Sequence, residues 1–260
     1  MVKGLSMKFQ SYEETVPKIL KIIKLDKELK KHQVVILKPT ISADSAITST
    51  PKELVKAVAE FCMEHKNPVT DIFIAEGVDG ADTLERFEEL GYNDIAEKLG
   101  IGLIDLNDTE TEILEPYQTE KFEEVIFPKI LMNSFVISLP KLFEDEEIGL
   151  NGSLSGMLGA YPSSYYKGFF SKTKTKIKKH PIKYSIHDIL MCKMPDLALI
   201  DASEFGMLIA GKPLEADKFS AKLFGRDWNE YPHLRLISER FSDEPKTDAQ
   251  DELNELIGIK

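Results

Sequence analysis

Blocks of apolar and polar positions along the chain predict helices and strands in alternation. From Tyr12 to Lys30, apolar residues recur at helical spacing among lysines, which predicts an amphipathic helix. A continuous apolar run at residues 34–37 predicts a strand covered on both faces, and Pro39 ends it because proline offers no amide hydrogen. Pro51 then fits the first position of a second helix, with Thr50 as its cap.

The alternation continues through the rest of the chain. Further strands are predicted at residues 71–77, 101–107, 134–140 and 196–202. Further helices are predicted at residues 82–91, 93–100, 122–133, 185–193, 215–225 and 233–241, with Pro128 expected to kink or restart the third of these. Together the elements predict an α/β fold with a largely parallel central sheet flanked by helices. We expect one such domain over residues 1–241, followed by a polar, weakly helical tail over residues 242–260.

Composition narrows the classes of function. The 260 residues are 42% hydrophobic, enough for a sizeable core, and the net charge of -11 disfavours binding to nucleic acid. Cys62 and Cys192 stand apart from any Cys/His cluster, so neither a disulfide framework nor a zinc or iron–sulfur site is indicated. No segment approaches the roughly 18 apolar residues that cross a bilayer. We therefore expect a cytoplasmic protein without export or membrane contact.

Polar residues close several of the predicted strands. They are Lys38, Glu76, Asp105, Asn107, Lys141 and Asp201. In an open α/β sheet, ligands collect beyond the carboxyl ends of the strands, so these side chains are suited to bind a charged substrate or a divalent metal ion, or to shift one another's pKa. Ordinary solvation of strand ends is the alternative.

The stretch from Asn151 to Gly168 is rich in glycine, serine and tyrosine and holds one lysine, Lys167. Small residues such as Gly152 and Ser155 permit the backbone to approach a ligand closely, although the glycine spacing matches no dinucleotide or P-loop fingerprint. Close packing of a helix on the sheet explains the same residues equally well. The basic run at residues 171–183 follows directly, and a solvated connection is favoured there over an anion-binding arm.

Several phrases in order resemble one family of archaeal and bacterial proteins, the family of domain of unknown function number 362. Its members carry a strand ending in Lys-Pro-Asn, a strand ending near an acidic residue and glycine, and a Pro-Lys-Leu-Lys-Thr-His segment. These are followed by a Thr-Gly-x-x-Lys-Asn-x-x-Gly segment, a strand ending in Asp-Gly and an Asp-Pro-x-x-x-Asp helix ending in glycine. This chain shows "VVILKPT", "DIFIAEG", "LPKL", "NGSLSGMLG", "LALIDA" and "AGKPLEADKFSAKLFG". The resemblance covers most of the chain and implies the same α/β fold.

The chain departs from the polar signature of that family at several positions. Thr40 stands in place of asparagine, residues 143–145 in place of Lys-Thr-His, Ser155 and Gly156 in place of Lys-Asn, and Lys212 in place of aspartate. The positions that still match are Lys38, Pro39, Glu76, Gly77, Pro140, Lys141, Gly152, Gly159, Asp201, Pro213, Asp217 and Gly225. The chain is therefore identified as a divergent member of that family with altered polar motifs and no ferredoxin module.

Two hypotheses for function follow. In the first, the protein binds and transforms a small anionic or phosphorylated metabolite in a pocket at the strand ends, made locally positive by two lysines. Its predicted catalytic residues are Lys141, Glu76 and Asp201, and its predicted ligand-binding residues are Lys38, Gly77, Asn151, Gly152, Ser155, Lys167 and Asp217. In the second, the protein keeps the fold but has lost catalysis, and acts as a binding or assembly protein.

Cofactor and partner expectations are sparse. Glu76, Asp201 and Asp217 offer oxygen ligands suited to magnesium, whereas zinc would need thiolate or imidazole partners. Some members of the family are fused to ferredoxin-like modules, but no iron–sulfur cysteines occur on this chain, so a link to electron transfer requires a separate redox partner. The sequence does not predict an oligomeric state.

Overall fold

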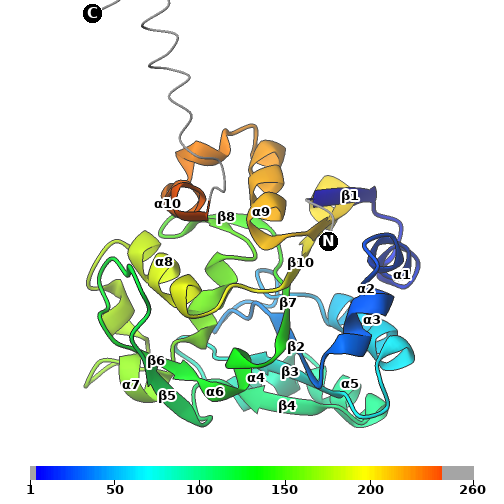
Figure 1. Ribbon diagram of the computed structural model, residues 1–260, viewed down its shortest axis with the longest axis horizontal. Helices are drawn as coiled ribbons and strands as arrows, with labels where there is room; N and C mark the ends of the chain where they lie inside the picture. The colour runs from blue at the N-terminus through cyan, green and yellow to red at the C-terminus, as the bar shows by residue number, and fades with distance from the viewer. Residues whose placement is uncertain (1–3, 242–260) are drawn as a thin grey trace, which may run out of the picture.

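A seven-stranded sheet forms the centre of the computed structural model, which describes residues 4–241 (Figure 1). The strands lie in the order β1-β11-β10-β7-β2-β3-β4. Five neighbours run parallel, namely β10 (Leu197–Ala202), β7 (Phe135–Leu139), β2 (Val34–Pro39), β3 (Asp71–Glu76) and β4 (Gly102–Asp105). Two strands, β11 (Met207–Gly211) and β1 (Gly4–Lys8), continue the sheet in antiparallel fashion. The predicted α/β class with a largely parallel sheet is confirmed.

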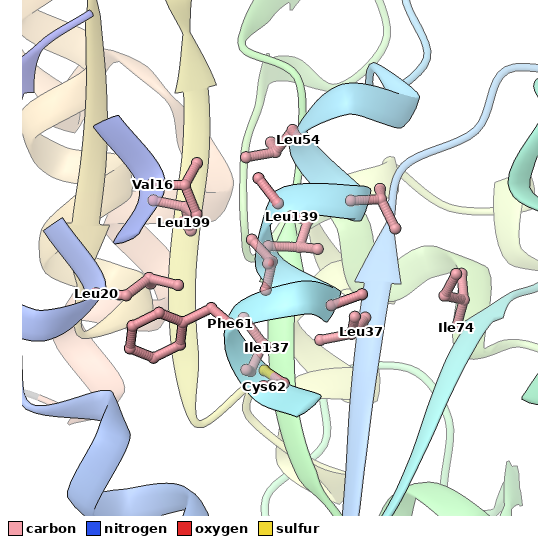
Figure 2. Close-up of a cluster of buried hydrophobic side chains, with 14 of the residues drawn as sticks. Val16, Leu20, Leu37, Leu54, Phe61, Cys62, Ile74, Ile137, Leu139 and Leu199 are labelled. Carbon is pink, nitrogen blue, oxygen red and sulfur yellow. The ribbon is translucent and has the colours of Figure 1, made fainter. Parts of the chain in front are cut away.

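Hydrophobic cores cover both faces of this sheet. Successive residues of β2 point to opposite faces, so Leu37 joins one core and Ile36 the other. On the first face, α1 (Tyr12–Ile22) and α3 (Lys52–His65) pack against the strands, and Figure 2 shows Leu20 and Phe61 from these helices beside Ile137. Burial on both sides explains why the central strands are apolar almost throughout.

The second face is covered by helices from the later part of the chain. They are α8 (Ile182–Cys192), α9 (Pro213–Ala221) and α10 (Pro232–Phe241), with the 3-10 helix η2 (Ser155–Ala160) beneath α8. The remaining helices are α2 (Leu25–Glu28), α4 (Thr83–Glu89), α5 (Tyr92–Leu99), α6 (Lys129–Met132) and α7 (Ser163–Tyr166). Short 3-10 turns occur at Leu29–Lys31, Thr175–Lys178, Ser203–Phe205, Lys222–Phe224 and Trp228–Glu230. None of the helices within residues 4–241 is long and apolar enough to cross a bilayer.

Three local predictions were wrong. The first predicted helix is broken at Lys24, which adopts a left-handed conformation with φ of 64° between α1 and α2. Residues 122–133 form the strand β6 (Val125–Pro128) and only one turn of helix, because the β-branched and aromatic residues of β6 pair with β5 (Thr111–Leu114). Thr50 does not cap α3, since its hydroxyl accepts from the Thr40 amide and donates to the Leu139 carbonyl.

Two further features complete the description. A hairpin of β8 (Phe143–Asp145) and β9 (Gly149–Asn151) leads into the glycine-rich segment and was not predicted. The predicted tail over residues 242–260 lies outside the described residues, and the domain boundary at residue 241 stays a prediction.

We predict that His233 makes folding sensitive to acid. Its side chain is buried on α10 without a hydrogen bond of good geometry to either ring nitrogen within the described residues, and burial lowers its pKa to about 4, with the nearby Ile148 backbone partly opposing the shift. Below the ordinary histidine pKa of 6.5, His233 is protonated in the unfolded chain but stays neutral in the folded protein until the pH approaches 4. The free energy of unfolding therefore falls by about 2 kcal/mol for this group as the pH drops from about 7 to about 5. Urea unfolding should show that His233→Leu removes this part of the pH dependence.

The exposed His180 provides the matched control. His180→Leu should leave the pH dependence of unfolding unchanged, and equal slopes for wild type and His233→Leu would contradict the prediction.

Candidate functional site

A buried ion pair joins the carboxyl ends of two adjacent parallel strands. Lys38 near the end of β2 places its Nζ 2.6 Å from Oε2 of Glu76 at the end of β3, and both side chains are almost fully buried. The same ammonium donates to the Gly156 carbonyl at 2.7 Å, while Oε1 of Glu76 accepts from the Gly77 amide at 2.8 Å. Because each charge has several partners, the pair is held in one geometry.

The glycine-rich segment lies directly against this ion pair. A Cβ on Gly159 would stand 1.7 Å from Oε1 of Glu76, and a Cβ on Gly77 would stand 2.3 Å from the Gly159 carbonyl oxygen. Both positions therefore require glycine, because the backbone of one segment packs onto the ion pair of the other. The close approach that the glycines predicted is present, and here it serves packing between protein segments.

Asp217 fixes the start of the same segment from α9. Its two carboxylate oxygens accept from the amides of Ser153 at 2.8 Å and Leu154 at 2.9 Å. Burial raises the pKa of Asp217 to about 7, and the two amide donors oppose that shift. Gly152 is close to the carboxylate too, since a Cβ there would lie 2.7 Å from Oδ1. Asp217 thus positions the backbone rather than facing a cavity.

A cavity of about 140 Å³ lies beside the ion pair at the carboxyl edge of the sheet. Gly77, Gly156 and Gly159 line it together with the polar residues Thr40, Glu76, Asp79, Glu147, Asn151, Ser155, Lys174 and Lys178. Apolar side chains such as Ile148 and Ile177 complete the wall. This mixture of an apolar wall and a few convergent polar groups is typical of a site for a small ligand.

Lys174 brings a second buried cation to this cavity. Its side chain is 1% exposed, and its Nζ donates to the carbonyls of Gly77 at 2.7 Å and Gly159 at 3.3 Å. Among residues 4–241, no carboxylate oxygen lies within 4 Å of this Nζ, although Asp79 accepts from the backbone amide of Lys174 at 2.6 Å. Burial lowers the pKa of Lys174 to about 8, with Glu76 and Asp79 opposing that shift.

Lys174 was missed in the sequence because it lies within the basic run. That run was interpreted as a solvated connection, and its neighbours Lys172 and Lys176 are indeed exposed. The one feature of the sequence that could have indicated the burial of Lys174 is the apolar Ile177, three residues later. Ile177 is buried and shows which side of the 3-10 turn faces the protein interior. Lys178 pairs with Glu147 at 3.0 Å and Asp79 at 3.7 Å, at the margin of the cavity.

The other predicted site residues lie elsewhere. Lys141 follows β7, and its Nζ pairs with Glu204 at 2.8 Å rather than joining Lys38. Asp201 on β10 accepts from the Tyr12 hydroxyl and the Ser203 amide, each at 3.1 Å. Lys38 and Lys141 lie at the ends of the neighbouring strands β2 and β7, as expected from the topology. Their ammonium groups nevertheless have separate partners, and Lys141 does not line the cavity.

Lys167 is exposed and lines a separate open hollow that also includes Asp105 and Asn107. Asn151 and Ser155 do line the cavity, where the Asn151 amide donates to the Lys141 carbonyl and the Ser155 hydroxyl accepts from the Gly152 amide. The structure therefore gathers Glu76, Gly77, Asn151 and Ser155 around one cavity, and Lys38 lies beside it as the partner of Glu76. Gly152 and Asp217 do not line the cavity, but Asp217 holds the backbone of the segment that does, through the amides of Ser153 and Leu154.

A metal site does not emerge from the three carboxylates proposed for magnesium. Glu76, Asp201 and Asp217 are each satisfied by different donors. Within residues 4–241, no group of three or more His, Cys, Asp or Glu side chains is arranged to hold a metal ion. A larger hollow of about 370 Å³ lies at the opposite edge of the sheet, where Phe135 and Leu197 begin their strands, so it is not at the edge where ligands of such sheets collect.

These features define an α/β protein with a small polar cavity at the carboxyl edge of its parallel strands. The chain belongs to the family described as Domain of unknown function (DUF362), whose model matches residues 35–227. No curated protein sequence gives a significant match.

Two solved structures are similar in fold. The lactate racemase apoprotein from Thermoanaerobacterium thermosaccharolyticum has a TM-score of 0.51 at 15% identity, over 92% of this chain and 58% of that chain. A protein from Thermotoga maritima has a TM-score of 0.46 at 12% identity, over 84% of this chain and 60% of that chain. The chain thus spans about three fifths of the length of these two proteins, and the first likeness extends to the fold alone.

We predict that removing one partner of the buried ion pair destabilises the protein more than removing both. Lys38→Met leaves the Glu76 carboxylate buried without its cation, which should lower the free energy of unfolding by about 3 to 5 kcal/mol. The double variant Lys38→Met/Glu76→Met should recover much of that loss, as measured by urea unfolding. Lys18→Met, which removes an exposed ion pair with Glu14, should change the same quantity by less than about 1 kcal/mol.

A Lys38→Met variant as stable as the Lys18→Met control would show that the pair is solvated in solution. A loss in the double variant equal to the sum of the losses in Lys38→Met and Glu76→Met would show that the two side chains contribute independently.

Proposed function

We propose that the protein binds a small anionic ligand, a carboxylate or a phosphate ester, in the cavity beside the Lys38–Glu76 pair. The observation that carries this proposal is the buried ammonium of Lys174, which lines the cavity and has carbonyl oxygens but no ion-paired carboxylate among residues 4–241. A buried charge is costly unless a counter-charge lies beside it. A bound anion supplies that counter-charge.

The other lining groups suit the remainder of such a ligand. Asn151, Ser155 and Thr40 offer amide and hydroxyl groups around the same space. The Lys38–Glu76 pair is internally neutral, and Lys178 pairs with both Asp79 and Glu147 at the margin of the cavity. None of the carboxylates that line the cavity is therefore in direct contact with the Lys174 ammonium among residues 4–241. A cavity near 150 Å³ accommodates roughly six non-hydrogen atoms, as benzene shows in an engineered apolar cavity, which favours a small metabolite.

Chemistry on the ligand would rest mainly on Glu76, since it is the predicted catalytic residue that lines the cavity, whereas Lys141 and Asp201 do not. Lys174 adds an amine whose lowered pKa suits it to exchange a proton near neutral pH. Lactate, the substrate named for the structurally similar racemase, is itself a small carboxylate and so falls within the proposed ligand class. We continue to expect a cytoplasmic location from the acidic composition.

The second hypothesis, a binding or assembly protein without catalysis, is favoured by one observation. Two positions that differ from the family motif are engaged in structural contacts: Ser155 bonds the backbone of its own segment, and Glu144 accepts from the Tyr231 hydroxyl at 2.7 Å. Turnover of a bound carboxylate, followed by chromatography, distinguishes the two hypotheses because both permit binding.

We predict that anions stabilise the protein through Lys174. Inorganic phosphate, lactate and pyruvate should be tested by thermal unfolding, where a ligand at 100 times its dissociation constant stabilises the fold by about 2.7 kcal/mol. Lys174→Met should lose the stabilisation, whereas Lys172→Met, at an exposed lysine of the same run, should keep it. Stabilisation that survives in Lys174→Met would place the anion elsewhere, and no effect from any of the three anions would contradict the proposal.

We predict that lactate affinity weakens in alkaline solution. The pKa of Lys174 is lowered to about 8, so the free protein loses the ammonium charge as the pH rises through that value, and affinity should then fall by up to about tenfold per pH unit. Lactate keeps its own charge throughout this range, so titration calorimetry between about pH 7 and about pH 9.5 isolates the protein group. A flat profile for the wild type would exclude Lys174 as the counter-charge.

A further inference from the structure

A closed loop at Gly168–Thr173, here called the aromatic loop, carries two phenylalanines into solvent. The Gly168 amide donates to the Thr173 carbonyl at 3.3 Å and closes the loop. Phe169 is 94% exposed and Phe170 is 98% exposed, and their rings meet edge to face at a centroid distance of 4.7 Å. Adjacent large apolar side chains with almost complete exposure are typical of an interaction surface.

The conformation of the aromatic loop is fixed by its own polar groups. The Ser171 amide donates to the Gly168 carbonyl at 3.3 Å, and the Thr173 amide donates to the Ser171 hydroxyl at 3.0 Å. A Cβ on Gly168 would lie 2.6 Å from the Thr175 hydroxyl oxygen, so a larger residue there would have to displace the Thr175 side chain. The two rings are therefore held outward by a built turn.

Unpaired positive charge surrounds these rings. Residues 163–183 include seven lysines and no aspartate or glutamate, in a chain whose net charge is -11. Six of the seven, all except Lys178, form no ion pair with a carboxylate in the part of the chain that the structure describes. Of these six, Lys167, Lys172 and Lys179 are exposed and form no hydrogen bond through the ammonium within residues 4–241. Asp82, Asp105 and Asp108 share an open hollow with Lys167 and Lys172, but no carboxylate oxygen of these three lies within 4 Å of either ammonium.

We propose that the aromatic loop docks on the surface of a bilayer that contains anionic phospholipids. Phe169 and Phe170 insert at the boundary between headgroups and acyl chains, while Lys167 and Lys172 contact lipid phosphates. Charge complementarity selects this occupant, because the net negative charge of the chain repels an anionic membrane except where the lysines gather. The absence of a spanning helix within residues 4–241 does not bear on a peripheral contact of this kind.

The convex shape of the aromatic loop favours a bilayer over an acidic protein. Two projecting rings need a matching pocket on a protein partner, whereas the headgroup region opens around any apolar projection. The expectation of no membrane contact rested on the lack of an apolar segment long enough to cross a bilayer, and the proposal departs from it for this loop alone. The docking is independent of the cavity ligand, because neither phenylalanine lines the cavity.

Flotation with two kinds of vesicle tests the proposal on the full chain. Vesicles of equal parts phosphatidylcholine and phosphatidylglycerol should bind the wild type at low salt, and vesicles of phosphatidylcholine alone should not. The variant Phe169→Ser/Phe170→Ser should bind at least about tenfold more weakly. Each of Lys167→Gln and Lys172→Gln should weaken binding by about fivefold, and raised salt should weaken it for every variant.

Val69→Ser is the matched control, because Val69 is 78% exposed in the turn that precedes β3. It should bind as the wild type does, and circular dichroism should show that all variants remain folded. Binding of the double phenylalanine variant equal to that of the wild type would overturn the proposal. Failure of the wild type to bind the phosphatidylglycerol vesicles would also overturn it and would favour a pocket on an acidic protein as the occupant.

Discussion

The buried contact between Lys38 and Glu76 is the constraint on which the site depends. Two charges removed from water must satisfy one another and their remaining donors and acceptors, and here they do so with the backbone of Gly77 and Gly156. That requirement draws the glycine-rich segment onto the strand ends. Gly77 and Gly159 are glycines because a Cβ at either position would collide with the opposite segment or with Glu76. The cavity is the space left between the glycine-rich segment and the strand ends, beside the Lys38–Glu76 ion pair.

A division of labour among the polar groups results. Asp217 on α9 and the pair between β2 and β3 hold the backbone around the cavity, whereas Lys174 enters from a different segment and presents charge to the ligand space. The groups that are paired with one another or with backbone amides hold the structure together, and Lys174, which has no directly paired carboxylate among residues 4–241, is the group that we propose binds the ligand. The Lys38–Glu76 pair and Asp217, which are residue types often found in catalytic sites, thus hold the structure together here. The proposed binding group, Lys174, lies in the basic run at residues 171–183.

The sequence predicted the central architecture well because burial on both faces imposes long apolar strands, as in β2 and β7. It failed where pairing partners are distant or polarity is mixed. The sequence around β6 was interpreted as a helix because its partner strand could not be recognised in the sequence. That partner, β5, has only four residues and is only partly buried. The family resemblance and the positions of the strand ends placed Lys38, Glu76 and Gly77 in the predicted pocket. The ion-pair partner of each charged side chain depends on the tertiary structure and could not be predicted from the sequence. No local pattern distinguishes Lys174 from the exposed lysines on either side of it.

The pairing of β1 with β11 has a consequence for synthesis of the chain. Gly4 lies opposite Gly211, so the earliest strand finds its partner only after more than two hundred residues have left the ribosome. Until then the backbone N–H and C=O groups of β1 have no partner strand, and a strand with unpaired backbone groups is prone to pair with another chain. Its short length, its alternation of half-buried and exposed residues and its terminal Lys8 make it a poor template for such association. The strand that closes the sheet is thus also the one best suited to remain unpaired during translation.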